Sequence, residues 1–415
     1  MKTKKVQPYF LSPTIGTISE DKIVGREKEI ISLLRLLQGQ SVTVEEIRRM
    51  GKTLLVQKLA YRCNNDLLSE EFKKDNFKAK YLTFQGKENF AQLIEHLIRE
   101  LQDFKNWYNI DLSNTYNAIA KILNIPKFSI LGVDISIDLP VYEQHSKEIF
   151  NNLLNDISNS LKKNKTKLIL IFDELPIMLW DWYKKGKYNE AIELLDILRE
   201  RRQSLEKSGL RFIFCGSIGM NVILDTFKTK YGYTGEATNE MEQFSLGAFS
   251  YEEVEFLCEC YTLAGFNVKN NKRKWKLINK LTNGIPFYIS KIFNIIQMDF
   301  DKKITEGNIK SAYDEILNNT KNHNSFKQLV DRIDTYYSQE RSMIMKTILN
   351  FLSKQEDFIS EENIIAGIDY DEKSLKNNLY TLLADHYLLR KIVDDKRYYK
   401  FKYEIFRKWW RINIA

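Results

Sequence analysis

The chain has 415 residues, of which 43% are hydrophobic and 28% charged, and it carries a net charge of +8. This balance is ordinary for a soluble globular protein, and the length excludes a single compact core in favour of two to four units. The longest apolar runs, such as residues 168–172, are far too short to cross a bilayer. No apolar stretch follows the basic residues 1–5, so we expect no secretory signal, no membrane partner and a cytoplasmic location.

Apolar residues at two different spacings predict alternating strands and helices in the first half of the chain. In chain order, we predict a helix over 26–37, a strand over 41–44, a helix over 52–63, a strand over 80–84, a helix over 90–104, a small inserted hairpin over 127–140, a strand over 167–172, a helix over 188–207 and a strand over 211–215. Strands separated by helices indicate an α/β fold, in which a parallel sheet is covered by helices.

The second half of the chain changes character. Every periodic segment from about residue 251 to residue 320 is helical, with a loop at 282–286 between two of them. Short helices follow from residue 326, and then a two-stranded hairpin over 387–402 with a charged turn at its tip. We therefore predict an all-α domain followed by a winged-helix domain.

The cysteine and histidine residues show no pattern of catalysis or metal binding. Cys258 and Cys260 lie in a helical pattern, where their side chains would point about 200° apart and could not easily share a metal. No second Cys or His pair lies nearby. We expect reduced thiols and structural or surface histidines.

A nucleotide-binding motif, Gly51-Lys52-Thr53, lies between the first predicted strand and the second predicted helix. A triphosphate needs backbone N–H donors at a helix N-terminus, which small residues allow. It also needs a cation that reaches the β- and γ-phosphate oxygens, here Lys52, and a hydroxyl that ligates Mg²⁺, here Thr53. Gly-Lys-Thr is common by chance, but its place between a strand and a helix favours a phosphate-binding loop over coincidence.

One position departs from the full loop pattern G-x-x-x-x-G-K-[ST]. The first glycine is replaced by Glu46, which follows Glu45. A carboxylate here would repel a phosphate unless it turned outward or paired with Arg48 or Arg49. The sequence therefore leaves open how tightly this loop binds nucleotide.

Three polar residues at strand ends complete the predicted site. Asp173 and Glu174 follow the buried run 168–172, at the edge of a parallel sheet where such folds bind ligands. Asp173 would hold Mg²⁺ and Glu174 would deprotonate the attacking water; the alternative is that both acids only cap the following turn. Ser217, after the next strand, would place a hydroxyl near the γ-phosphate or form an ordinary turn.

Six motifs along almost the whole chain resemble those of the archaeal-type ATPases, a group of STAND P-loop NTPases related to AAA+ proteins. They lie at residues 23–29, 48–53, 170–176, 214–217, 284–286 and 407–411. The resemblance implies that Val24, Gly25 and Arg26 lie against the adenine, and that Pro286 contacts nucleotide when an all-α lid closes. It also implies that the C-terminal domain is a winged helix, and Glu46 is the main departure from the family pattern.

Together, the residues and the resemblance predict a site for ATP and Mg²⁺. The nucleotide-binding residues would be Val24, Gly25, Arg26, Arg49, Met50, Gly51, Lys52, Thr53, Leu54 and Pro286. The catalytic residues would be Glu174, Lys52 and Ser217, and the metal ligands Thr53 and Asp173. The domains would be an N-terminal extension over 1–22, a P-loop ATPase domain over 23–248, a helical lid over 249–322 and a winged helix over 323–415.

Two basic regions are open to more than one interpretation. Arg199, Arg201 and Arg202 are candidate arginine fingers, but a solvated basic helix face is favoured. The residues 387–411, with Lys402 and Arg407 among them, interleave basic and aromatic side chains. This mixture suits phosphate contact and base stacking, but aromatic residues also form the cores of small domains. A structural or protein-contacting role is favoured over binding of DNA or RNA.

We therefore predict an ATP-binding and slowly hydrolysing switch that couples nucleotide state to a protein or nucleic-acid partner. An oligomer is compatible with this prediction. The alternative is a catalytically weak pseudo-ATPase adaptor that binds DNA or protein through its winged helix, with nucleotide as a structural ligand.

Overall fold

The computed structural model describes residues 7–14, 16, 18–108, 110–123, 139–322 and 324–415, and the chain divides into two compact units. The sheet unit comprises Glu27–Glu45 and Lys52–Ser245. The helical unit comprises Met1–Arg26, Glu46–Gly51 and Leu246–Ala415. The predicted phosphate loop is therefore divided: the loop segment Glu46–Gly51 packs with the helical unit, while the residues before and after it belong to the sheet unit.

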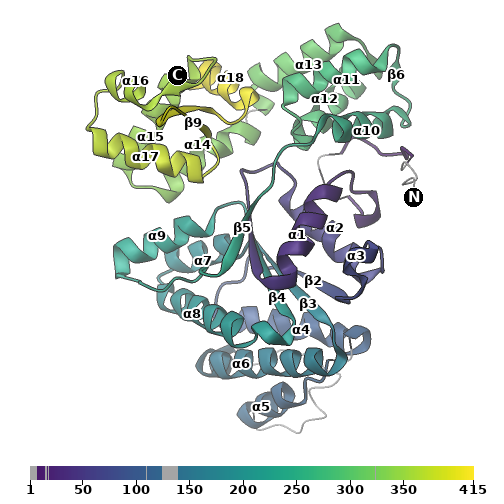
Figure 1. The fold of residues 1–415 in the computed structure, drawn as a ribbon, viewed down its shortest axis with the longest axis vertical. Helices are drawn as coiled ribbons and strands as arrows, with labels where there is room; N and C mark the ends of the chain where they lie inside the picture. Colours follow the sequence, from purple (N-terminus) through teal and green to yellow (C-terminus); the bar gives the residue numbers. More distant parts are fainter. Residues whose placement is uncertain (1–6, 15, 17, 109, 124–138, 323) are drawn as a thin grey trace. The chain divides into compact units, whose positions relative to one another are not determined.

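A parallel sheet forms the centre of the sheet unit (Figure 1). In the described residues its five strands run in the order β2-β3-β4-β1-β5, and each neighbouring pair is parallel. The strands are β1 (Ser41–Glu45), β2 (Phe77–Thr83), β3 (Lys167–Asp173), β4 (Leu210–Cys215) and β5 (Met241–Ser245). The predicted α/β sheet is confirmed. The sequence pattern did not predict β5, because this edge strand is mostly polar and partly exposed.

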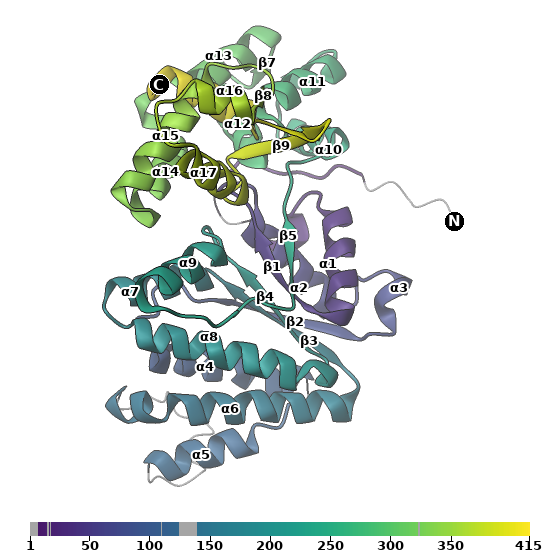
Figure 2. The same ribbon diagram turned by 60° about the vertical axis from the view of Figure 1, so that its left-hand side comes forward.

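Helices cover both faces of this sheet (Figure 1 and Figure 2). The helices of the sheet unit are α1 (Glu27–Gly39), α2 (Lys52–Asn64), α3 (Glu70–Lys73), α4 (Phe90–Tyr108), α5 (Ser113–Leu123), α6 (Leu139–Asn164), α7 (Leu175–Lys184), α8 (Tyr188–Ser204), the 3₁₀ turn η3 (Glu206–Ser208) and α9 (Met220–Tyr231). α1 packs on β1 and α2 on β2, while α6, α7 and α8 pack on β4. The predicted helices over 26–37, 52–63, 90–104 and 188–207 are confirmed as α1, α2, α4 and α8.

α5 packs on α6, on the side of α6 that faces away from the sheet (Figure 2). The buried carboxylate of Asp156 in α6 accepts hydrogen bonds from the N–H and hydroxyl of Thr115, both at 2.8 Å, and so fixes the start of α5. The hairpin predicted for 127–140 lies outside the described residues, except that its last two positions begin α6.

The first part of the helical unit is a helix bundle. Its helices are α10 (Tyr251–Thr262), α11 (Asn271–Thr282), α12 (Pro286–Asp299) and α13 (Glu306–Asn318), with the short strands β6 (Asn267–Val268) and β7 (Lys303–Ile304) and the 3₁₀ turns η1 (Glu20–Lys22) and η4 (Thr320–Asn322). Ser250 and Glu253 form a reciprocal capping box that starts α10. Pro286 opens α12, a position where its missing N–H costs nothing.

The C-terminal segment, residues 324–415, completes the helical unit. It contains α14 (Asn324–Tyr336), α15 (Gln339–Ser353), β8 (Ile359–Ser360), α16 (Glu361–Ala366), α17 (Glu372–Ala384), β9 (Leu388–Val393), β10 (Lys396–Phe401) and α18 (Glu404–Asn413). The strands pair antiparallel in the order β8-β10-β9. The N–H of Ile405 donates to Asn283 Oδ1 at 2.9 Å, which links this segment to the helix bundle.

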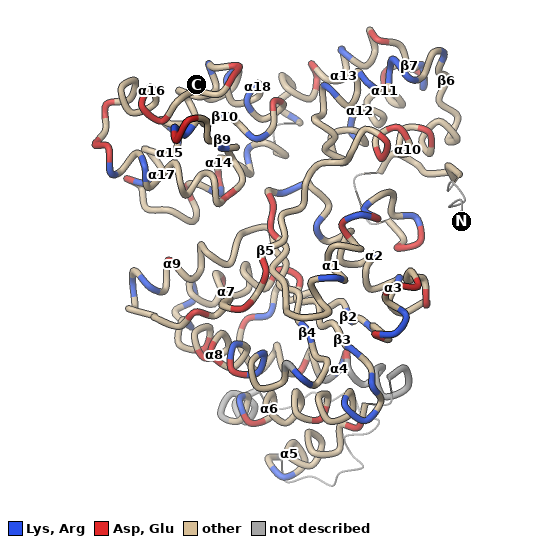
Figure 3. The backbone as a smooth tube through the Cα atoms, viewed as in Figure 1, with Lys and Arg blue, Asp and Glu red and all other residues tan. Residues whose placement is uncertain are grey.

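Charged residues are distributed over both units, with Lys and Arg interspersed among Asp and Glu (Figure 3). Within the described ranges, no helix combines the length and the apolarity that a bilayer span needs.

Candidate nucleotide-binding site

The loop segment Glu46–Gly51 joins β1 to α2, as the sequence predicted for a phosphate-binding loop. Its last part has an unusual backbone, since Arg49 has a φ of +75° and Gly51 a φ of +87°. A Cβ on Gly51 would meet nothing within 4 Å, so the left-handed backbone and not lack of space requires glycine there. The loop can therefore turn tightly into α2.

The first residues of α2 are Lys52, which is 7% exposed, and the half-buried Thr53 and Leu54. A helix N-terminus carries a partial positive charge and presents N–H groups, which together favour binding of phosphate. The ammonium group of Lys52 adds a full charge at the same end of the helix. This arrangement matches the predicted roles of Lys52 and Thr53.

The predicted metal ligands, Thr53 and Asp173, lie next to each other. Thr53 Oγ1 donates to Asp173 Oδ2 at 2.9 Å, and Asp173 is only 2% exposed. The hydroxyl of Tyr81 donates to the same carboxylate oxygen at 2.8 Å, and the N–H of Glu174 donates to Oδ1 at 3.1 Å. Sequence reasoning missed Tyr81, because a tyrosine is common in strands and nothing in its neighbours points to a site.

The second acid, Glu174, faces Ser217. Glu174 Oε2 accepts hydrogen bonds from the N–H of Ser217 at 3.1 Å and from its hydroxyl at 3.2 Å. Glu174 precedes α7 with a φ of +58°, and its side chain makes no capping hydrogen bond, so the turn-capping alternative is wrong for this residue. A Cβ on Gly216 would lie 2.8 Å from Pro176 Cδ, so glycine is needed to bring the end of β4 against α7.

In the helical unit, Arg26 holds the loop segment from the N-terminal side. Its guanidinium donates to the carbonyl oxygens of Met50 and Gly247, each at 2.8 Å. Gly25 has a φ of +70°, and a Cβ there would lie 2.6 Å from Glu253 Oε1. The same carboxylate oxygen accepts the N–H of Arg26 at 2.6 Å. Arg26 thus has a direct structural role in shaping the loop.

The loop segment also meets the predicted lid motif within the helical unit. The guanidinium of Arg49 lies 4.5 Å from the centroid of the Phe287 ring, which follows Pro286 at the start of α12. Gly284 has a φ of +69°, and a Cβ there would lie 2.5 Å from the carbonyl oxygen of Phe249. A cation above an aromatic face is attracted to it. Among the other predicted residues, Val24 is buried.

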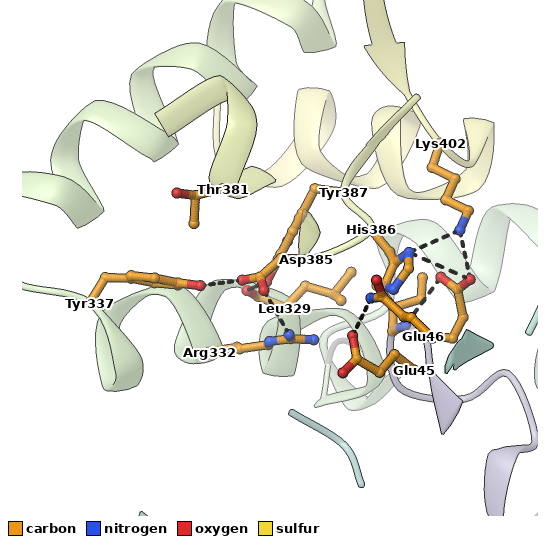
Figure 4. Close-up of polar contacts among 12 residues, drawn as sticks. Glu45, Glu46, Leu329, Arg332, Tyr337, Thr381, Asp385, His386, Tyr387 and Lys402 are labelled. Atoms are coloured by element: carbon orange, nitrogen blue, oxygen red, sulfur yellow. Dashed lines mark hydrogen bonds and ion pairs between the residues drawn. The ribbon is translucent and has the colours of Figure 1, made fainter. Parts of the chain in front are cut away.

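Glu46 is paired with a residue from the far end of the chain (Figure 4). Lys402 Nζ donates to Glu46 Oε2 at 2.6 Å. His386 Nδ1 lies 3.9 Å from the same oxygen and 3.3 Å from Lys402 Nζ. The Glu46 side chain is 0% exposed and that of Lys402 15% exposed. The sequence left open whether Glu46 turns outward or pairs with Arg48 or Arg49. The structure shows a buried side chain that pairs with Lys402, a partner without a local signal because 356 positions separate the two residues.

Several aromatic residues of the C-terminal segment, and one of its arginines, are buried inside the helical unit. Trp409 stacks on Phe326 with ring centroids 5.1 Å apart, and Trp409 and Trp410 are 2% and 1% exposed. Arg407 is buried and donates to the carbonyl oxygen of Ser353 at 2.9 Å and to Glu404 Oε2 at 2.7 Å. These rings form a core, as the favoured structural interpretation predicted, and cannot stack on bases.

Two of the three candidate arginines of α8, Arg201 and Arg202, make hydrogen bonds within the sheet unit. Arg202 is buried, donates to the carbonyl oxygen of Ala237 at 2.7 Å and lies 5.7 Å from the centroid of the Phe214 ring. Arg201 donates to Asn151 Oδ1 at 2.7 Å. The prediction of a solvated face is wrong, because these cations hold α8 against its neighbours.

The residues at the carboxyl edge of the sheet fit a magnesium-bound nucleotide. Among the described residues, no three or more His, Cys, Asp or Glu side chains gather as a metal cluster. Mg²⁺ in nucleotide sites needs only one or two protein oxygen ligands in addition to phosphates and waters. Thr53 and Asp173 supply a hydroxyl and a carboxylate, and Lys52 supplies the cation for phosphate.

Comparison with known proteins finds a family model over this part of the chain. Residues 50–176 match the model of the KAP family P-loop domain. The matched span begins in the loop segment and extends beyond the Asp173–Glu174 pair into α7. The sheet and this match together define a P-loop NTPase fold. No curated protein matches the chain.

Solved structures extend the likeness beyond the P-loop domain. The chain is similar to a Walker-type ATPase of Pyrococcus abyssi, with a TM-score of 0.60 and 17% identity over 94% of this chain and 97% of that one. It is also similar to the ORC2 protein of Aeropyrum pernix in ADPNP-ADP complexes, with a TM-score of 0.47 and 14% identity over 96% and 92% of the two chains. The first of these shows a shared fold and confirms, at the level of fold, the resemblance to archaeal ATPases.

Proposed function

We propose that this P-loop NTPase is an ATP- and Mg²⁺-dependent switch of the STAND and AAA+ kind, which couples nucleotide state to a partner. The observation that carries this proposal is the ion pair between Glu46 and Lys402. It joins the loop segment to the C-terminal segment within one compact unit. A change in the loop on binding nucleotide would therefore act directly on the C-terminal segment.

The same ion pair removes the objection to nucleotide binding that the sequence raised. An isolated carboxylate in the phosphate loop would repel a triphosphate, by several kcal/mol at about 4 Å and an effective dielectric constant of about 20. Lys402 neutralises the charge of Glu46 at 2.6 Å. The pair has no net charge, so Lys52 and the start of α2 remain the dominant electrostatic features for a phosphate.

Slow hydrolysis would follow from the arrangement of Glu174 and Ser217. We assign Glu174 as the general base for the attacking water. The two hydrogen bonds from Ser217 engage the same carboxylate oxygen and hold the side chain of Glu174 in place. Bound Mg²⁺, held by Thr53 and Asp173, would neutralise charge on the phosphates. A base that Ser217 holds in place would reorient more slowly toward the attacking water, which suits a switch that dwells in its ATP form.

We further propose that the partner is a protein rather than a nucleic acid. The sequence predicts a winged helix for this C-terminal segment. Arg397 lies 3.6 Å from Glu361, and Lys396 lies 3.5 Å from Glu362, so acids of α16 offset two basic residues of β10. The hydroxyl of Tyr399 donates to Glu361 at 2.9 Å. These acids reduce the positive charge that β10 would offer to phosphates.

One observation favours the alternative of a pseudo-ATPase adaptor. If Ser217 held Glu174 permanently, the chain would bind nucleotide without turnover, and its C-terminal segment would recruit a partner in every nucleotide state. The two functions differ in whether nucleotide changes the C-terminal segment.

Hydrogen exchange of the purified protein, with and without Mg-ATP, distinguishes a switch from a pseudo-ATPase adaptor. For a switch, we expect Mg-ATP to change exchange within residues 386–403, and we expect Lys52→Ala to abolish that change. Lys28→Ala, which removes an exposed lysine of α1, is the control and should respond as wild type. Nucleotide binding without any change in residues 386–403 would support the adaptor and reject the switch.

A further inference from the structure

We propose that Tyr81 and Cys215 are positioning residues that hold the Asp173 carboxylate in place for a divalent cation. This inference rests on the nucleotide-binding function proposed above, and it adds two residues to the predicted metal site. Neither residue is expected to ligate the cation. Their role would be to fix the carboxylate that does.

The two residues approach Asp173 from the strands on either side of it. In the register of the sheet, Asp173 at the end of β3 pairs with Thr83 of β2 and with Cys215 of β4. Tyr81 lies two residues before Thr83, so the two side chains leave β2 on the same face. The hydroxyl of Tyr81 reaches Asp173 Oδ2 at 2.8 Å. Cys215 lies directly opposite Asp173 in the register of β3 and β4, so its thiol is on the same face of the sheet as that carboxylate.

A phenolic hydroxyl and a thiol are both neutral hydrogen-bond donors, so each can donate to a carboxylate without carrying a charge.

Neutral donors suit a metal ligand better than a cationic partner would. A lysine or arginine beside Asp173 would cancel the charge that attracts a cation. The hydroxyl of Tyr81 and the N–H of Glu174 hold the carboxylate and leave its charge in place, and the thiol of Cys215, beside it in the register, would do the same. Groups that orient metal ligands in this way strongly influence metal affinity.

A purely structural role for Tyr81 is the competing explanation, because any hydrogen bond to a buried carboxylate also stabilises the fold. The two roles differ in what they change. A positioning role alters the Mg²⁺ concentration at which nucleotide binds. A structural role lowers thermal stability and leaves that concentration unchanged.

The test measures binding of a fluorescent ATP analogue to the full chain as Mg²⁺ is titrated, and again in EDTA. For Tyr81→Phe and Cys215→Ala, we expect the Mg²⁺ midpoint to rise about 10- to 100-fold, as is typical when a group that orients a metal ligand is removed. Binding in EDTA should stay as in wild type. Cys215→Ser keeps a donor and should restore a midpoint close to that of wild type.

Tyr233→Phe is the matched control. The hydroxyl of Tyr233 donates to Asp196 Oδ1 at 2.8 Å in the same unit, so this variant removes a tyrosine–aspartate bond of the same length away from Thr53. We expect its Mg²⁺ midpoint to equal that of wild type. Thermal unfolding of every variant reports any loss of stability separately.

The outcomes distinguish this inference from the function on which it rests. If wild type binds the analogue equally well with Mg²⁺ and in EDTA, the proposed metal site and this inference both fail. If wild type depends on Mg²⁺ but Tyr81→Phe and Cys215→Ala match Tyr233→Phe, only the positioning role is overturned. If either Tyr81→Phe or Cys215→Ala fails to fold, the Mg²⁺ midpoint of the other variant tests the positioning role.

Discussion

Two buried carboxylates, Asp173 in the sheet unit and Glu46 in the helical unit, have contrasting surroundings. Asp173 is held by neutral donors, among them the hydroxyls of Thr53 and Tyr81. Glu46 is held by a cation, Lys402, with His386 beside it. Both acids are almost inaccessible to solvent, so their partners decide what each can do.

The comparison shows why the loop segment can contain the acid Glu46, whereas the predicted metal site at the end of β3 needs the charge of Asp173. Neutral donors leave the charge of Asp173 available for a cation. The ammonium of Lys402 cancels the charge of Glu46, so that the acid becomes a point of attachment for the C-terminal segment. We therefore interpret Glu46 as a coupling residue and not as a defect of the loop.

The largest expected effect comes from exchanging the charged oxygen of Asp173 for an amide. We expect Asp173→Asn to raise the Mg²⁺ midpoint for nucleotide binding by more than about 100-fold, because loss of a ligand should exceed the effect of losing a group that only orients it. Glu46→Gln should leave the Mg²⁺ midpoint unchanged. Mg²⁺ titration with a fluorescent ATP analogue measures both variants. Equal shifts would show that the two acids do not differ in role.

The next effect concerns stability. Lys402→Met leaves the buried carboxylate of Glu46 without its cation, and we expect a loss of about 3 kcal/mol in the free energy of unfolding, at the lower end for a broken buried pair. Lys346→Met is the control, since its ion pair with Asp334 is partly exposed and should contribute less than about 1 kcal/mol. Urea unfolding of both variants provides the measurement. Equal midpoints would contradict a buried, structural ion pair.

A smaller effect tests the close packing that brings Ser217 to Glu174. We expect Gly216→Ala to cost about 1 to 3 kcal/mol and to lower ATP turnover, because its Cβ would overlap Pro176 in a packed region. Gly219→Ala, in the same turn, should be tolerated, since its Cβ would meet Glu45 at an ordinary 3.5 Å. Thermal unfolding and phosphate release are the readouts. If both variants show the same stability and the same rate of phosphate release, the close packing at Gly216 does not contribute to ATP turnover.

The sequence predicted one side of this comparison much better than the other. Asp173, Glu174 and Ser217 could be found because each follows a buried strand, and the ends of parallel strands meet at one edge. Tyr81 could not be found from the sequence, because its contact with Asp173 depends on the register between β2 and β3. The polar edge strand β5 was missed for lack of an apolar pattern.

No local sequence pattern could predict the partner of Glu46. Lys402 is one of many basic residues near the C-terminus, and nothing in its neighbours distinguishes it from them. Only the folded helical unit brings it to the loop segment. The same is true of Arg202, whose buried position follows from the packing of α8 and not from its sequence context.

The most direct test is the affinity for Mg-ATP of Lys402→Met, Glu46→Gln and the variant with both changes, measured by calorimetry. We expect Lys402→Met to bind at least about 10-fold more weakly than wild type, a difference of about 1.4 kcal/mol, because the unpaired acid then repels the triphosphate. The double variant should recover most of the loss, since it has no acid to neutralise. If Lys402→Met binds Mg-ATP as tightly as wild type, the charge of Glu46 does not reach the nucleotide, and the proposed coupling through this ion pair is wrong.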